Sequence, residues 1–294
     1  MRADEAERLL ALARERDLAR LRSEQASLEE AVRFLAADGR DEDAAELAAG
    51  VWRLWFVSGD VAGGRRLLGA ALEGGGPPSR ARALALYGDG LLAFRQGAQV
   101  ESRARNEAAL ENARAVGDRE AVALALVGLS RVAFRDGDYD RVRSLALEAR
   151  ELTRDLDPDA DVAPLHMLAA GTRLAGDHGG AVALYQESLD LNRRLGDSRM
   201  VGVELHNLGH VELHRGNVEA AERCFSECAE IRNEDDPYEA AMTHLNRAAL
   251  AFAGGDRDLA ADLLGRTQAT LDASGIVLDP DDAFEVDWLC ARLE

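Results

Sequence analysis

The chain has 294 residues, of which 47% are hydrophobic and 5% aromatic, a composition that favours a folded protein over a disordered one. Its 54 acidic residues outnumber its 35 basic residues, which gives a formal net charge of −19. Every basic residue is an arginine, so a P-loop ATPase, a protein kinase and a Schiff-base enzyme are excluded, because each needs a lysine.

The charge and the apolar runs also indicate where the protein acts. A strongly negative chain opposes the phosphate contacts that supply most nucleic-acid affinity, so we expect no direct binding to nucleic acid. The first residues mix acids with arginines, unlike a signal peptide. The longest apolar runs, such as residues 121–129, are far shorter than the roughly 20 residues of a membrane span. We therefore expect a cytoplasmic protein that makes no membrane contact.

Three parts are expected along the chain. Residues 1–40 contain two helical segments, 5–21 and 27–37, and are expected to form N-terminal capping helices. Residues 41–275 contain the repeats. Residues 276–294 are expected to form a C-terminal capping helix, because Asp279 and Pro280 make a good helix start before Phe284, Trp288 and Leu289. This last helix should cover the final apolar face of the repeats.

Glycines recur across the central part with a spacing of 38 to 40 residues. Each ends an apolar stretch, and they are Gly59, Gly97, Gly137, Gly176, Gly216 and Gly255. A second set of breaks stands 20 residues after each of the last five, at Gly117, Asp157, Gly196, Asp236 and Gly275. Each unit is thus two apolar-periodic segments of about 15 to 18 residues closed by helix breakers, a pattern typical of a helical hairpin.

Positions at fixed offsets from these glycines predict how the hairpins stack. The residues seven before, five after and twelve after each glycine are mostly small, which lets neighbouring helices approach closely. In the first hairpin Trp52 stands where a small residue is expected, and in the second hairpin Asp89 replaces an apolar residue. Residues 74–78, rich in glycine and proline, are expected to form a loop between the first two repeats, with a domain linker as the alternative. The expected fold is all-α, a right-handed superhelical solenoid of about six hairpins with N- and C-terminal capping helices.

The repeat resembles the tetratricopeptide repeat (TPR) in a longer-period form. The resemblance rests on residues 205–217 (LHNLGHVELHRGN) and 133–139 (AFRDGDY). Residues 15–21, 28–35, 51–59 and 64–68 resemble the start of the sensor half of bacterial multidomain regulatory ATPases, which include LuxR-type and antibiotic-regulatory activators. Without lysine the chain has no GxxxxGK[ST] motif. The resemblance therefore implies a detached or free-standing sensor part without the ATPase module.

The TPR resemblance implies that residues two, three, six and ten before each turn glycine face a concave groove. These columns hold arginines, histidines and one tyrosine, with almost no acids: Arg53, Tyr87, Arg95, Arg131, Arg135, His166, Arg173, His206, His210 and His214. Asn207 and Asn246 share the column nine before the glycine, where the repeat family often uses an asparagine to bond the backbone of a ligand. A hydrogen bond between helices is the alternative role for these two residues.

A positive groove in a negative chain would concentrate anions. We hypothesise an anionic ligand, either an acidic peptide, a chain-terminal carboxylate or a phosphorylated metabolite, with Arg131, Arg135 and Arg173 as bidentate donors. The alternative is that these arginines pair with acids on neighbouring helices.

The histidines suggest two further uses. His206, His210 and His214 are spaced four apart, with His166 and His244 on the flanking first helices. Histidines four apart on a helix can hold zinc, and such a patch can respond to pH. No HExxH motif is present, however, and histidine is ordinary at the His206 position of this repeat class. We expect no metal and no cofactor.

Other reactive residues have structural interpretations. Cys228 stands in a small-residue column four after Cys224, so packing is expected rather than catalysis. The acidic pairs at 235–236 and 281–282 lie at predicted loops or helix starts, where they are expected to cap helices and stay at the surface. Nothing resembles a catalytic triad, and no enzyme activity is expected.

These features predict a non-enzymatic regulatory module whose concave groove binds a peptide or protein segment. The alternative function is a small-molecule inducer sensor that acts on a separate ATPase or DNA-binding subunit.

Overall fold

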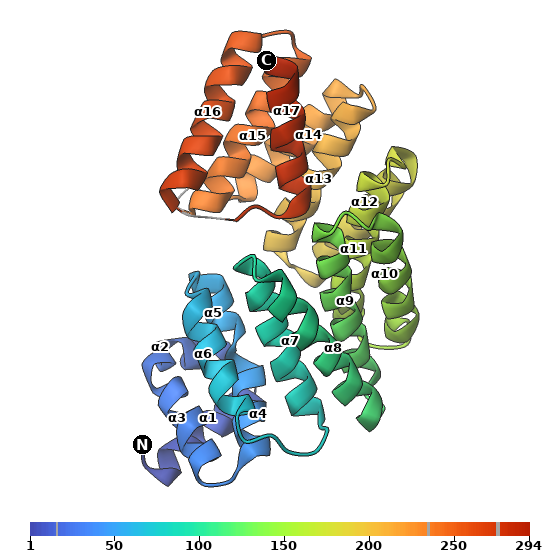
Figure 1. The fold of residues 1–294 in the computed structure, drawn as a ribbon. Helices are drawn as coiled ribbons and strands as arrows, with labels where there is room; N and C mark the ends of the chain where they lie inside the picture. Colours follow the sequence, from blue (N-terminus) through green and yellow to red (C-terminus); the bar gives the residue numbers. More distant parts are fainter. Residues whose placement is uncertain (16, 234–235, 275–276) are drawn as a thin grey trace. The chain divides into compact units, whose positions relative to one another are not determined.

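The computed structural model describes residues 1–15, 17–233, 236–274 and 277–294, and over these residues it contains helices and no strand (Figure 1). The elements are α1 (Ala3–Arg14), α2 (Leu18–Ser23), α3 (Gln25–Ala37), α4 (Asp41–Val51), α5 (Arg53–Ser58), α6 (Val61–Leu72), α7 (Arg80–Arg95), α8 (Gln99–Val116), α9 (Arg119–Arg135), α10 (Tyr139–Thr153), the 3₁₀ turn η1 (Pro158–Asp161), α11 (Val162–Leu174), α12 (His178–Leu195), α13 (Ser198–His214), α14 (Val218–Ile231), α15 (Pro237–Ala253), α16 (Arg257–Ser274) and α17 (Pro280–Leu293). The expected all-α fold of consecutive helical hairpins is confirmed.

The chain forms two compact units. The first comprises residues 1–132 and 151–156, and the second comprises residues 133–150 and 157–294. The expected boundary after residue 40 falls between α3 and α4. The expected boundary after residue 275 lies outside the described residues. The division into caps and repeats stays a prediction.

The periodic glycines lie where the chain turns between helices. All six have a positive φ, from 72° at Gly97 to 88° at Gly176. This left-handed conformation costs glycine no steric energy, whereas a residue with a Cβ is strained there. In the second set of breaks, Gly117 and Gly196 end α8 and α12 in the same conformation. Gly275 lies outside the described residues.

The first hairpin departs from the pattern at Trp52, where the helix is interrupted between α4 and α5. The indole of Trp52 is 3% exposed and packs edge to face on Phe56 and Tyr87, with ring centroids 6.2 and 6.1 Å apart. It lies against Gly88 of α7, where an added methyl group would be 2.9 Å from the ring. A large residue fits in a small-residue column because the facing residue is glycine.

Asp89, the departure in the second hairpin, is buried and doubly paired. Its carboxylate accepts from Arg65 Nε of α6 at 2.9 Å and lies 2.7 Å from Arg105 Nε of α8. The two guanidinium groups compensate the cost of burying the acid. The segment between α6 and α7, residues 73–79, is a loop inside the first unit, as expected from its glycines and prolines.

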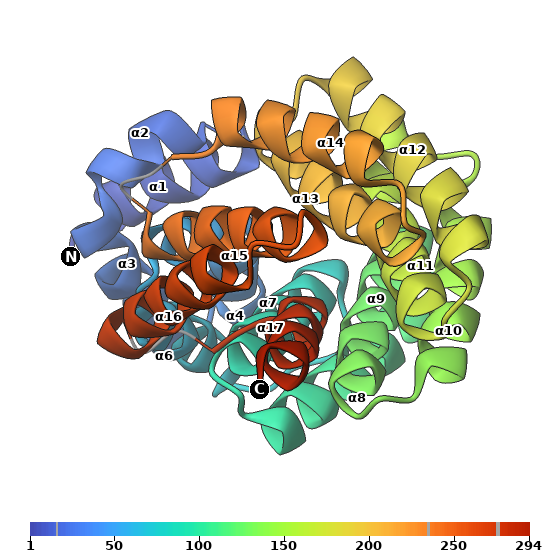
Figure 2. The ribbon, with the colours of Figure 1, turned by 90° about the horizontal axis from the view of Figure 1, so that it is seen from above.

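In the second unit the hairpins α11–α12, α13–α14 and α15–α16 follow one another. The first helices α11, α13 and α15 lie side by side (Figure 2). The helix α12 packs against α11 and α13, and α14 packs against α13 and α15. The close approach depends on small residues. At Gly209 of α13, an added methyl group would lie 2.3 Å from the ring of Phe225 in α14.

The helix α17 runs alongside α15 and α16 (Figure 1). Val286 and Leu289 of α17 join Leu245 and Leu264 in a buried apolar cluster. The expected closing helix that covers an apolar face is therefore present. Within the described residues, no helix is both long enough and apolar enough to cross a membrane.

Candidate functional site

The residues expected to line one groove are divided between the two units. Arg53, Tyr87, Arg95 and Arg131 belong to the first unit. The other eight belong to the second unit, and they are Arg135, His166, Arg173, His206, Asn207, His210, His214 and Asn246.

In the first unit the expected site residues pack mainly on aromatic rings. The guanidinium of Arg53 lies 4.8 Å from the ring centre of Trp52, and that of Arg95 lies 5.4 Å from the ring centre of Phe56. Tyr87 is buried against Trp52. Arg131 on α9 is half-buried. These contacts pack Arg53, Tyr87 and Arg95 against aromatic rings.

In the second unit, four basic side chains gather in one place. Helical spacing places His206, His210 and His214 on one face of α13, and Arg173 joins them from α11. We call these four residues the basic cluster. Arg173 and His206 are 2% and 3% exposed, and His210 is fully buried. The cluster is therefore covered rather than open to water.

The cover comes from α17. Glu285 of α17 accepts a hydrogen bond from Arg173 and lies 2.9 Å from His214 Nε2 and 3.3 Å from His210 Nδ1. Asp282 lies 2.8 Å from His206 Nε2. The alternative in which an arginine pairs with an acid of another helix is thus found at Arg173, although that acid lies 112 residues away along the chain.

The expectation that residues 281 and 282 stay at the surface is wrong. Asp281 and Asp282 are each 6% exposed, and Asp282 contacts His206 of the basic cluster and Tyr238. In the other pair, Asp236 caps α15 by accepting from two backbone amides. Asp235 lies outside the described residues.

His166 belongs to a neighbouring network around Glu204, a residue that the sequence analysis missed. Glu204 Oε1 lies 3.0 Å from His166 Nδ1 and accepts from Ser188 Oγ at 2.8 Å, and its side chain is fully buried. Equivalent positions in two other repeats, twelve before the turn glycine, are Ala85 and Ala125. The remaining repeats have Leu47, Pro164 and Thr243 at this position, so a single acid in an otherwise uncharged column is the signal that could have found it.

The two asparagines bond other helices. Asn207 Oδ1 accepts from Arg173, and Asn246 Oδ1 lies 3.0 Å from His210 Nε2. The interhelical role left open for them is observed. His210 Nδ1 also lies 3.3 Å from Glu285 Oε2, so both ring nitrogens lie near oxygen atoms.

Burial and charge shift the acids of α17 in opposite directions. Burial, reinforced by the charge of Asp282, raises the pKa of Asp281 to about 7. Burial alone would also raise the pKa of Glu285, but the charges of His210 and Arg173 outweigh it and lower that pKa well below its usual value. Glu285 is therefore a carboxylate at neutral pH, and Arg173, His210 and His214 surround it.

His206, unlike Arg173, is uncharged at neutral pH. Burial lowers the pKa of His206 to about 4, although Asp282 opposes the shift. At neutral pH the neutral ring donates its Nε2 proton to Asp282, which also accepts from the hydroxyl of Tyr238. The basic cluster thus offers both charged and neutral donors to carboxylates.

The remaining chemical candidates have packing roles. Cys228 is buried and donates to the carbonyl of Gly202, and burial raises the pKa of Cys224 to about 11, so neither thiol is activated as a nucleophile. Among the described residues no group of three or more histidines, cysteines and acids is arranged to hold a metal ion.

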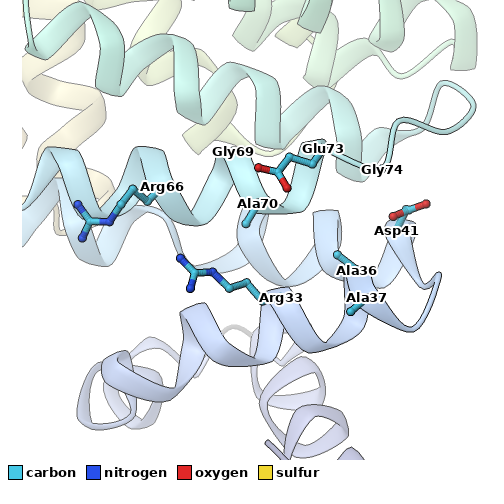
Figure 3. A pocket seen from close by; sticks show the side chains of 9 residues that line it. All are labelled: Arg33, Ala36, Ala37, Asp41, Arg66, Gly69, Ala70, Glu73 and Gly74. Carbon is cyan, nitrogen blue, oxygen red and sulfur yellow. The ribbon is translucent and has the colours of Figure 1, made fainter.

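The first unit contains a separate hollow of about 770 Å³ (Figure 3). It lies between α3 and α6 and near the start of α4, and none of the expected site residues lines it. Arg33 and Arg66 lie at one end and Asp41 at the other, with Glu73 and small residues between them (Figure 3). The lining mixes both charge signs.

The sequence matches no protein-family model, and no curated protein matches it. By structure the fold is TPR-like. The chain is similar to a tetratricopeptide repeat protein from Parabacteroides merdae ATCC 43184, with 11% identity, a TM-score of 0.58 and alignment over 98% of this chain and 100% of that one.

Two further similar structures contain a bound factor or peptide. One is a Rap protein complexed with Competence and Sporulation Factor (TM-score 0.66, 16% identity, 97% of this chain and 80% of that chain). The other is NprR in complex with its cognate peptide NprX (TM-score 0.60, 15% identity, 98% of this chain and 81% of that chain). At these identities the similarity shows the fold.

Proposed function

We propose that the protein is a non-enzymatic regulatory recognition module and that its basic cluster binds a carboxylate-bearing segment of a peptide or protein. The observation that carries the proposal is the contact of Glu285 with Arg173, His210 and His214, since it defines a site whose chemistry suits a carboxylate. Recognition by TPR-like proteins of a peptide, as in the NprR–NprX complex, supports it by analogy of fold.

A binding role also fits the absence of activated groups around the cluster. Its histidines face carboxylates and amides, and no serine, threonine or cysteine nucleophile bonds to them within the described residues. Arginine and histidine donors at fixed positions can select a ligand without changing it chemically.

The test is titration of the full chain with a library of acidic peptides at low and high salt. We expect salt-sensitive binding, because charged contacts weaken as ions screen them. Arg173→Gln should weaken binding by about 30-fold or more, since loss of one partner of a buried charge pair costs about 2–5 kcal/mol. The matched control is Arg194→Gln, an exposed position on α12. No salt-sensitive binding to the wild-type chain would contradict the proposal.

The alternative function is the small-molecule inducer sensor that acts on a separate ATPase or DNA-binding subunit, as the resemblance to regulatory ATPases implies. The hollow between α3 and α6 favours it, because about 770 Å³ suits a small ligand and Arg33 and Arg66 could hold an anionic group. Thermal-shift measurements with phosphorylated metabolites test it. A shift that Arg66→Gln abolishes and Arg173→Gln preserves would favour this function over peptide binding.

A further inference from the structure

The basic cluster already has an occupant, because α17 presents three acids to it. Asp281, Asp282 and Glu285 stand at successive positions i, i+1 and i+4, which share one side of a helix. On the opposite side Asp287 is exposed. The buried face of α17 therefore consists of acidic residues at its start and apolar residues further along.

The contacts of α17 reach several helices that are far away in the sequence. Asp282 bonds His206 of α13 and Tyr238 of α15, while Glu285 bonds Arg173 of α11. Trp288 packs edge to face on His214, with ring centroids 4.9 Å apart. This is how an amphipathic helical segment docks against a receptor, with charged anchors that set the register and an apolar face that buries area.

Stability alone does not explain these charges. A buried ion pair loses in desolvation much of what it gains in attraction, and well-packed apolar residues often stabilise a fold as well or better. Glu285 and Arg173 are both about 2% exposed, so their pair is of this costly kind. The positions of Arg173 and Glu285 determine which helix can dock. This selectivity is the property that a recognition site needs.

The docked helix also contains an unfavourable group. Asp281 is buried beside the carboxylate of Asp282, and burial together with that charge raises the pKa of Asp281 to about 7. Ionisation of Asp281 at neutral pH therefore weakens the docking of α17. A segment from another molecule can compete with a helix that is held imperfectly.

We propose that α17 is an intramolecular occupant of the partner-binding site, and that the partner is an acidic amphipathic helix with the same spacing of acids and aromatic residue. This inference rests on the proposed function and specifies its ligand. Because the tethered helix competes at a high effective concentration, it lowers the apparent affinity for the partner, so α17 is autoinhibitory.

The experiment measures binding in trans of a synthetic peptide with the sequence of residues 279–294, made with serine for Cys290. Three forms of the full chain are compared: wild type, the double variant Asp282→Asn with Glu285→Gln, and Asp287→Asn as the matched control on the exposed side of α17. The double variant weakens the docked helix but keeps the basic cluster. We expect it to bind the peptide at least about 10-fold more tightly than the wild type and the control.

A second peptide tests the chemistry. Replacement of its three acids, Asp281, Asp282 and Glu285, by amides should abolish binding, because the acids are the groups that the basic cluster recognises. Circular dichroism and urea denaturation establish that the double variant is folded. In the wild type, the indole signal of Trp288 in isotope-labelled protein should shift as unlabelled peptide displaces α17, so the inference is tested even if the double variant does not fold.

The outcomes separate the inference from the proposed function. Equal peptide affinity for the three forms, or no binding and no Trp288 shift, would overturn the inference. If acidic library peptides then still bind through Arg173, the proposed function stands with a different ligand class. If neither the library nor the peptide binds any folded form, both fail.

Discussion

Asp281 makes the stability of the protein depend on pH. Its pKa in the folded chain is about 7, whereas an exposed aspartate titrates near about 4. Between these pH values the unfolded chain has released the proton and the folded chain keeps it, so raising the pH favours the unfolded state through this group. The charged groups that act on Asp281 are Asp279, Asp282, Arg173 and His166.

Replacing Asp281 by asparagine should remove this titration at nearly constant side-chain shape. We expect the variant to gain stability relative to the wild type as the pH rises from about 4 to about 7, and the difference to stay constant at higher pH. Urea denaturation at one-unit steps of pH measures it.

The neighbouring His206 titrates with the opposite sign. Its pKa is lowered to about 4, so on acidification below about 6.5 the unfolded chain takes up a proton before the folded chain does, and stability falls. In the Asp281→Asn variant, the loss of stability caused by the titration of His206 at acidic pH should be visible without the opposing contribution of Asp281. Asp287→Asn, on the exposed side of the same helix, should leave the pH profile unchanged. A difference between Asp281→Asn and wild type that is constant with pH would contradict the assignment.

The sequence could not predict which acids contact the basic cluster. Residues 281 and 282 follow Pro280 at a helix start, where acids usually interact with the free amides of the first turn, so the pattern is the same for a surface cap and for a buried contact. Arg173 and Glu285 are 112 residues apart and share no repeat column. The grouping of the histidines on α13 was predictable, because helical spacing alone determines it.

At the scale of the elements, the glycine period predicted the turns well, because a positive φ at each turn selects glycine locally. The break in the helix at Trp52 was not predictable in this way. It depends on Gly88 of a different helix, and a period along the chain contains no information about which residue faces which.

The stacking of α13 on α14 gives a direct test of the small-residue columns. Gly209→Ala should destabilise the protein by about 1–3 kcal/mol, because the new methyl group would overlap the Phe225 ring. Gly265→Ala in α16 is the matched control. Nothing lies within 4 Å of its added methyl group, so it should stabilise by about 0.5–1 kcal/mol through helix propensity. Chemical denaturation distinguishes the two, and equal effects would show that the helices do not approach closely at Gly209.

At the scale of the whole molecule, each compact unit contains buried apolar clusters of its own. The apolar cluster of the first unit extends from Ala6 to Ala125, and those of the second unit extend from Ala169 to Leu289. A change in one unit should therefore act mainly on that unit. This expectation concerns local stability, which hydrogen exchange measures residue by residue.

Asp89→Asn provides the measurement. Loss of the buried charge between Arg65 and Arg105 should cost about 2 kcal/mol, less than the about 3–5 kcal/mol of a fully buried pair, because both arginines are partly exposed. Amide protection should fall in α6, α7 and α8 and stay the same in α13 to α16. Glu107→Gln, an exposed acid on α8, serves as the control. An equal loss of protection in both units would mean that the chain unfolds as one cooperative body.

The position of α17 over Arg173 also bears on the timing of a response. In the mechanism that we propose, a partner reaches the guanidinium only after the helix has left, so association proceeds by release followed by capture. The observed rate then approaches a ceiling as the partner becomes more concentrated, and this ceiling is the release rate of α17. In this mechanism, the lifetime of the docked state of α17, rather than diffusion, sets how quickly the protein binds its partner.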